Sequence, residues 1–134
     1  MTSQTIPNPT LEGITERFDP IECLDESVRS RAGEELPQQP GRYVEVHGAE
    51  RALMIPLGDE AIRIGRGLGA DLRLDENSVS RRHAILVPSD DGTRILDDRS
   101  SNGTIVNGRR VQQAELANGD VIVIGRVVLR YLQV

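Results

Sequence analysis

The sequence predicts an all-β protein, an antiparallel β-sandwich of about ten or eleven short strands that follows a short N-terminal extension. From residue 42 onward, apolar and polar residues alternate with a period of two in short segments rich in Ile, Val and Leu. Tight-turn sequences separate these segments, and none of the connections has the length and period of a crossover helix. Short turns of this kind join antiparallel strands, whereas parallel strands need longer connections.

The chain of 134 residues is long enough for one domain and an extension, which we divide at residues 1–41 and 42–134. Residues 1–40 hold eight acidic and three basic residues, whereas residues 41–134 hold thirteen of each. Binding to a nucleic-acid backbone needs a net basic surface. We therefore expect no nucleic-acid partner.

The extension has apolar residues at three- and four-residue spacing, which predicts two short helices over residues 10–18 and 20–31. Asp19 is placed as the N-cap of the second helix, with Pro20 at its first position. The acidic composition also fits a partly disordered tail, so both descriptions stay open. Residues 34–41 are predicted to be a linker because they are rich in Pro, Gly and Gln.

The predicted strands follow one another at short, even intervals through the rest of the chain. They cover residues 43–46, 51–57, 61–64, 71–74, 83–87, 93–96, 104–106, 121–124 and 127–134. β-Branched side chains pack well on a pleated sheet, which favours strands in these segments. Phe18, Tyr43 and Tyr131 are the only aromatic residues, so the core should be aliphatic.

Catalytic residue types are scarce. The sequence has two histidines, His47 and His83, and one cysteine, Cys23. A catalytic triad or a metal cluster would therefore need most of its members from Asp, Glu and Ser alone. Asp97 and Asp98 form a carboxylate pair, but adjacent strand residues point to opposite faces of a sheet. We expect a protein that is not an enzyme and has no cofactor or metal.

The expected location is the cytoplasm. A single cysteine excludes an internal disulfide and fits a reducing compartment. The sequence has neither an 18-residue apolar run nor an N-terminus with the composition of a signal peptide. We therefore expect no membrane insertion.

Four short motifs occur in order where predicted strands meet loops. They are Ile-Gly-Arg at 64–66, Ser-Arg-Arg-His at 80–83, Ser-Asn-Gly-Thr at 101–104 and Val-Asn-Gly at 106–108. Their order and spacing resemble the forkhead-associated (FHA) domain family, and in particular small bacterial FHA proteins with an N-terminal extension. FHA domains are β-sandwiches whose loops bind phosphothreonine in partner proteins. The resemblance covers about residues 42–134 and leaves the extension unexplained.

The resemblance implies which residues bind the ligand. Arg66, Ser80 and Arg81 are expected to contact the phosphate and the peptide. Ser101 is expected to add a phosphate contact, and Asn102 to hold the backbone of the ligand. These residue types suit a phosphate, which carries about −1.5 to −2 charges at pH 7 and three acceptor oxygens. Arginine offers a planar fork of donors, and a hydroxyl adds a short directional hydrogen bond.

Five further residues are expected to support this site. The resemblance implies that His83 braces the recognition loops through hydrogen bonds, without touching the ligand. Gly65, Gly103, Asn107 and Gly108 are expected to allow close approach of the backbone or a positive φ.

The resulting prediction is a phosphothreonine-dependent protein–protein interaction module that works downstream of a Ser/Thr protein kinase. The alternative is a phosphorylation-independent scaffold or regulator that binds partners through its N-terminal helices. The extension is also predicted to contact the phosphopeptide site of its own chain. Thr5 and Thr10 lie in or beside its proline-broken segment and are the candidate phosphorylation sites.

Overall fold

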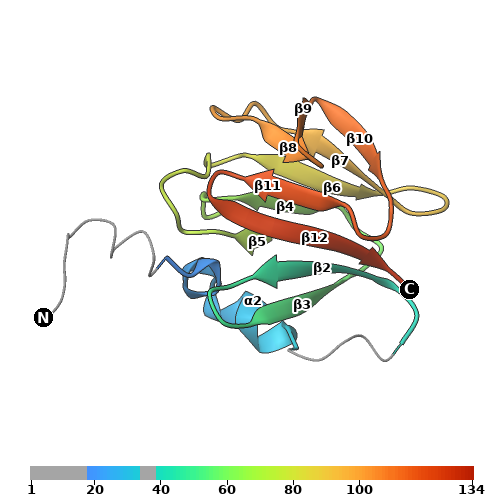
Figure 1. Cartoon of the computed structure of the whole chain (residues 1–134), viewed down its shortest axis with the longest axis horizontal. Helices are drawn as coiled ribbons and strands as arrows, with labels where there is room; N and C mark the ends of the chain where they lie inside the picture. The colour runs from blue at the N-terminus through green and yellow to red at the C-terminus, as the bar shows by residue number, and fades with distance from the viewer. Residues whose placement is uncertain (1–17, 34–38) are drawn as a thin grey trace, which may run out of the picture.

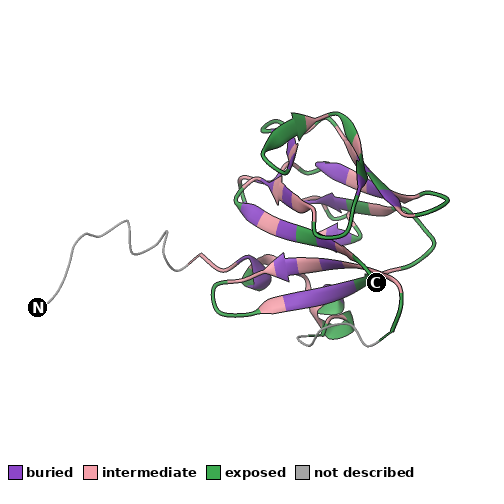
Figure 2. Cartoon of the chain, turned by 45° about the vertical axis from the view of Figure 1, so that its right-hand side comes forward, coloured by how far each residue is buried: buried purple, intermediate pink, exposed green. Residues whose placement is uncertain are grey.

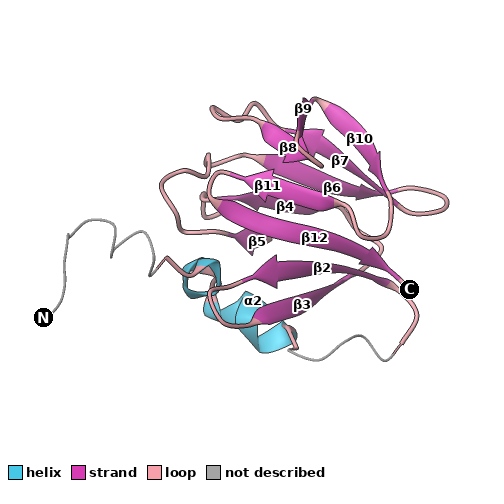
Figure 3. Ribbon diagram, in the orientation of Figure 1, coloured by secondary structure: helices cyan, strands magenta, loops and turns pink. Residues whose placement is uncertain are grey.

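The structure is a computed structural model that describes residues 18–33 and 39–134. It contains two β-sheets that pack face to face, and the helical segments all lie near the N-terminus (Figures 1 and 3). The five-stranded sheet has the spatial order β10 (Gln113–Leu116), β7 (Thr93–Asp97), β6 (Ala84–Pro88), β4 (Ile62–Gly65) and β5 (Leu72–Arg73). The six-stranded sheet has the order β3 (Ala52–Leu57), β2 (Arg42–His47), β12 (Val127–Gln133), β11 (Val121–Ile124), β8 (Thr104–Val106) and β9 (Arg109–Val111). The predicted β-sandwich is confirmed.

Two details of the strands differ from the prediction. β4 and β5 pair in parallel, whereas the other paired strands of the described chain are antiparallel. The predicted strands also leave out β9 and β10, each of which forms one edge of its sheet. These segments carry Arg109, Arg110, Gln113 and Glu115 in place of the apolar residues of inner strands. Polar side chains are common on edge strands, where they discourage pairing with other chains.

The core between the sheets is aliphatic, as the composition predicts. Figure 2 shows buried residues along the strands of both sheets. β12 shows the alternation clearly, because Val127, Leu129 and Tyr131 are fully buried while Arg130 between them is exposed. Tyr131 is the one aromatic residue of this core, and its hydroxyl donates a hydrogen bond to Thr93 Oγ1 over 3.0 Å.

The described part of the extension forms the 3₁₀-helix η1 (Pro20–Cys23) and the α-helix α2 (Glu26–Arg31). The sequence predicts one helix over residues 20–31, but Leu24 adopts an extended conformation between them and forms a β-bridge with Leu74. The Asp19 side chain accepts a hydrogen bond from the Ile21 amide over 3.1 Å, as an N-cap residue should. The predicted helix over residues 10–18 lies outside the described residues apart from Phe18.

This part of the extension closes one side of the sandwich. Leu24 bridges to Leu74, directly after the edge strand β5 of one sheet, and Gly33 bridges to Met54 on the edge strand β3 of the other (Figure 1). Ile21, Leu24 and Val28 of this segment point into the core and are at most 3% exposed. Burial of each such side chain contributes about 1.5–3 kcal/mol to stability. Residues 18–33 are therefore packed as part of the sandwich.

No helix in the described part of the chain is long and apolar enough to cross a membrane.

Candidate functional site

The recognition motifs meet because of the way three neighbouring strands pair. β6 is antiparallel to both β4 and β7, so the start of β6 lies beside the ends of the other two strands. Ala84 pairs with Ile64 on β4 and with Asp97 on β7. The loop after β4 (residues 66–71), the loop before β6 (residues 74–83) and the loop after β7 (residues 98–103) therefore share one end of the five-stranded sheet. We call these three segments the recognition loops.

Backbone contacts hold the loop after β4 and the loop before β6 together. The Arg66 amide donates a hydrogen bond to the Ser80 carbonyl over 2.9 Å, and the Gly67 amide donates one to the Arg81 carbonyl over 3.1 Å. Gly65 lies so close to the Arg81 carbonyl that a side chain at this position would clash with it. The close approach therefore requires glycine at position 65.

His83 joins these two loops to the loop after β7. Its ring is fully buried, Nδ1 accepts a hydrogen bond from the Ser80 amide over 3.0 Å, and Nε2 lies 2.9 Å from the Gly103 carbonyl. An amide N–H can only donate, so Nδ1 is unprotonated and Nε2–H donates to Gly103. The structure thus places His83 between the loops, bonded to both and away from solvent.

Ser80, Ser101 and Asn102 form a second connection between the loops. Ser80 Oγ accepts a hydrogen bond from the Ser101 amide over 2.9 Å, which leaves the hydroxyl proton of Ser80 available to a ligand. Asn102 Nδ2 donates to the Ser78 carbonyl over 3.2 Å. Gly103 has a φ of 90°, which the loop needs at its turn back into β8.

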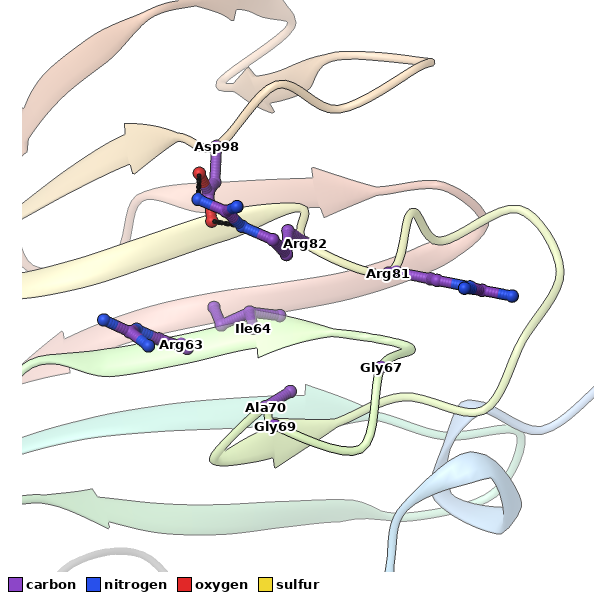
Figure 4. Close-up of a pocket in the computed structure, with 8 residues that line it drawn as sticks. All are labelled: Arg63, Ile64, Gly67, Gly69, Ala70, Arg81, Arg82 and Asp98. Carbon is purple, nitrogen blue, oxygen red and sulfur yellow. Dashed lines mark hydrogen bonds and ion pairs between the residues drawn. The ribbon is translucent and has the colours of Figure 1, made fainter.

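Three arginines of these loops have different partners. Arg66 Nε donates to the Val79 carbonyl over 3.0 Å, and no bond to its two terminal nitrogens is found among the described residues. Arg82 forms a two-point ion pair with Asp98, at 3.1 Å and 3.0 Å, and this hydrogen-bonded carboxylate raises the pKa of Arg82. Figure 4 shows that Arg81 points away from this pair and toward the other side of the loop.

The recognition loops therefore carry positive charge that no carboxylate of the described residues neutralises. Asp98 compensates Arg82, whereas Arg81 is exposed and forms no ion pair within residues 18–33 and 39–134. Arg81 also borders a surface hollow lined with Ser80 and Ser101 and a second hollow lined with Arg66. An anion between the two hollows would meet the guanidinium groups of Arg66 and Arg81 and the hydroxyl of Ser80.

Asp97 is a residue of this site that the sequence analysis did not identify as a support. It accepts hydrogen bonds from the Ser100 amide over 3.0 Å, from the Ser100 hydroxyl and from Thr104 Oγ1 over 2.7 Å. Burial raises the pKa of Asp97, but the hydrogen bonds from Ser100 and Thr104 outweigh it and leave this pKa below its usual value. The ionised carboxylate thus holds the loop that carries Ser101. Serine three residues after an aspartate is a turn signal that could have indicated this role.

Asn107 and Gly108 lie elsewhere. They form the turn between β8 and β9 with φ values of 51° and 84°. Since β8 runs away from Gly103, this turn stands at the end of β8 opposite to the recognition loops. Asn107 Nδ2 donates to Asp120 Oδ1, and Asn107 Oδ1 accepts from the Val121 amide, each over 3.0 Å. These residues stabilise the sandwich but do not touch the recognition loops.

Within the described residues, no group of three or more His, Cys, Asp or Glu side chains is arranged to hold a metal ion. Cys23 is also poorly suited to nucleophilic chemistry, because burial and the nearby carboxylates of Glu76 and Asp75 raise the pKa of its thiol. The recognition loops offer hydrogen-bond donors and positive charge, the two features that a binding site for an anion needs.

Comparison with known sequences agrees with this geometry. The FHA domain model matches residues 62–125, which include the recognition loops. The chain is 36% identical over 104 residues to an oxoglutarate dehydrogenase inhibitor of Corynebacterium jeikeium, covering 77% of this chain and 72% of that protein. It is also 52% identical over 69 residues to the ABC transporter ATP-binding/permease protein Rv1747 of Mycobacterium tuberculosis. That match covers 52% of this chain but only 8% of the transporter.

Solved structures give the same result. An FHA domain from a structural and functional analysis of phosphothreonine-dependent FHA domain interactions superposes with a TM-score of 0.62 at 33% sequence identity. The superposition covers 69% of this chain and 96% of that domain. The extent of these matches shows that the chain belongs to the FHA domain family.

Proposed function

We propose that this chain is a cytoplasmic, phosphothreonine-dependent interaction module that acts downstream of a Ser/Thr protein kinase. The observation that carries this proposal is the set of loops joined by His83. They present two guanidinium groups, those of Arg66 and Arg81, without a carboxylate that neutralises them in the described structure. A phosphate on a peptide is bound well by donors that loops on a rigid scaffold hold in a defined direction.

The roles follow from the chemistry of each side chain. Arg66 and Arg81 would bind the phosphate oxygens through their charged N–H groups, with the hydroxyls of Ser80 and Ser101 as further donors. Asn102 would hold the backbone of the peptide through its side-chain amide, after exchanging its bond to the Ser78 carbonyl or by using its free oxygen. None of these steps requires a cofactor.

The proposal is tested by calorimetric titration with three peptides of one sequence, drawn from a degenerate phosphothreonine library, that carry phosphothreonine, phosphoserine or threonine at one position. We expect phosphothreonine to bind best, phosphoserine to bind at least about fivefold more weakly, and unmodified threonine not to bind. The difference between the two phosphorylated peptides reflects one methyl group, whose burial is worth about 1 kcal/mol. Equal affinity for phosphothreonine and phosphoserine would indicate a general anion site, and equal affinity for all three would contradict the proposed function.

The alternative of a scaffold that binds partners through its N-terminal helices is not favoured. The apolar residues of η1 and α2 that would form such a face are Ile21, Leu24 and Val28, and all three are buried in the core of this chain. They are therefore not available to another protein without unfolding of the extension.

We also propose that phosphorylation of the extension regulates the site. Thr5 and Thr10, the candidate phosphorylation sites, lie outside the described residues. Phe18, where the described chain begins, lies beside the recognition loops, since the guanidinium of Arg126 stacks 3.9 Å from the centre of its ring. The Arg126 amide in turn donates to Ser78 Oγ over 2.9 Å. A phosphothreonine tethered at this end would reach roughly millimolar effective concentration and would compete with free partners.

Truncation provides the test of this regulation. Deletion of residues 1–40 would also remove Ile21, Leu24 and Val28 from the core, so the chain should be shortened only to residue 18. We expect kinase-treated full-length protein to bind a phosphothreonine peptide more weakly than the kinase-treated truncated protein, by about tenfold or more. Full-length protein with alanine at positions 5 and 10 serves as the control and should bind like the truncated form. Equal affinities after verified phosphorylation of the extension would exclude the regulation.

A further inference from the structure

Arg73 connects the extension with the phosphate site. Its Nε donates a hydrogen bond to the backbone carbonyl of Arg66 over 2.9 Å. Its Nη1 lies 3.2 Å from Asp25 Oδ1, and its Nη2 lies 3.8 Å from Asp75 Oδ1. All three nitrogens of the guanidinium are thus engaged, so the direction in which Arg73 holds the Arg66 carbonyl depends on the two aspartates.

Asp25 contacts Arg73 and does not cap the helix α2 with its side chain. It is the N-cap residue of α2, where an aspartate usually accepts a hydrogen bond from an amide of the first helical turn. No such bond forms, and the carboxylate faces Arg73. The side chain of Asp25 is 40% exposed and that of Arg73 is 22% exposed, so the pair is partly shielded from solvent.

The backbone beside this pair is also shared between the extension and the recognition sheet. Leu24 bridges to Leu74, and the Asp75 amide donates to the Cys23 carbonyl over 2.9 Å. The Leu74 amide donates to the Gly65 carbonyl over 2.9 Å. Residues 74–75 are therefore bonded on one side to the extension, through the Asp75 amide, and on the other to Gly65, the residue before Arg66. β5 itself has only two residues, and the extension covers its free edge.

We infer that Asp25 is a positioning residue of the phosphopeptide site, which acts through Arg73 on the backbone of Arg66. The extension is then a working part of the site, beyond its contribution to the core. This inference rests on the proposed function, because Arg66 is the residue through which it would change affinity. It assigns to Asp25, an acidic residue outside the recognition motifs, a favourable effect on the binding of an anion.

The sign of that effect separates the inference from simple electrostatics. Replacing Asp25 by asparagine removes a negative charge near a phosphate site, which by charge alone should strengthen binding. Asparagine is nearly the same size and is an equally good N-cap residue, so α2 should remain folded. If Asp25 positions Arg66, the same replacement should weaken binding despite the more favourable charge.

Glu26→Gln is the matched control. Glu26 is the next residue of the chain, and its only ion pair in the described structure is with Arg29 on the same helix, at 3.9 Å. Its side chain is 89% exposed, and this substitution removes one negative charge without affecting Arg73. Affinities of the wild-type chain, Asp25→Asn and Glu26→Gln for one phosphothreonine peptide should be measured by calorimetry, with the melting temperature of each.

We expect Asp25→Asn to bind about threefold to tenfold more weakly than the wild type, because its amide oxygen offers Arg73 only a neutral hydrogen bond in place of a charge-assisted one. Glu26→Gln should bind as well as the wild type or slightly better. In the double variant Asp25→Asn/Arg73→Gln, affinity should equal that of Arg73→Gln alone, because Asp25 has no effect without Arg73. Affinity of Asp25→Asn at or above that of Glu26→Gln would overturn the inference.

A second measurement does not need the peptide. Hydrogen exchange of the Arg66 and Arg73 Nε–H groups, followed by NMR in the free protein, should be faster in Asp25→Asn and unchanged in Glu26→Gln. Unchanged exchange in Asp25→Asn would overturn the inference whether or not the protein binds phosphopeptides. Absence of phosphopeptide binding by the wild-type chain would instead contradict the proposed function. A failure of the inference and a failure of the proposed function are therefore distinguishable.

Discussion

Replacement of Arg66 by alanine should weaken phosphopeptide binding strongly while the domain stays folded. The substitution removes a guanidinium that donates to the phosphate, and a hydrogen bond between charged groups is worth about 1.5–3 kcal/mol. Affinity should then fall by roughly tenfold to 150-fold in calorimetric titration. The fold should tolerate the change, because the bonds that tie position 66 to Ser80 and Arg73 involve its backbone and remain in the variant.

Arg63→Ala is the control for the lost charge. Arg63 is an exposed residue of β4, the strand that ends just before Arg66 (Figure 4). This variant should bind nearly as well as the wild type. Ser80→Ala should behave like Arg66→Ala, since it removes both a hydroxyl donor and the acceptor of the Ser101 amide. Wild-type affinity in Arg66→Ala or in Ser80→Ala would exclude the corresponding residue from the site.

Replacement of His83 by alanine should lower both the stability of the fold and the affinity for phosphopeptide. It leaves the Ser80 amide and the Gly103 carbonyl without their partner in a fully buried place. Each buried polar group without a partner costs about 1–3 kcal/mol, and the volume of the missing ring adds a further cost. We expect the melting temperature to fall by about 10 °C or more, as measured by calorimetry. The freed loops should also bind the peptide more weakly.

His47→Ala is the matched control, because His47 is the other histidine of the chain. It lies on β2 of the opposite sheet, is partly exposed and pairs with Glu45 on its own strand. Its removal should change neither melting temperature nor affinity appreciably. If His83→Ala kept the melting temperature of the wild type, the ring would not brace the loops, and the geometry of the site would need another explanation.

The fold class was predictable because its signal is local. The period of two in segments such as residues 43–46 places alternate side chains on one face, which predicts a strand with one buried side. Turn residues such as those at 107–108 then require each strand to reverse direction. The outer strands β9 and β10 could not be found in this way, because their side chains are mostly polar and their position depends on neighbours.

The candidate site was predictable only as a set of residue types in order. Arg66, Ser80, Ser101 and Asn102 do lie on loops that share one end of the sheet. The sequence analysis also predicts Asn107 as a structural support of this site. The three residues of β8 carry it to the opposite end, which only the direction of the strand decides.

By itself, the sequence determined the alternating strands, the turns between them and the order of the residues at the loops, since these depend on neighbours in the chain. Only the tertiary structure decided which arginine remains uncompensated, because Arg81 and Arg82 are adjacent and only Arg82 meets Asp98. It also decided that the extension is packed against the sandwich, where Asp25 meets Arg73. Pairings between residues this far apart depend on how the two sheets and their edges come together, and no local period in the sequence encodes them.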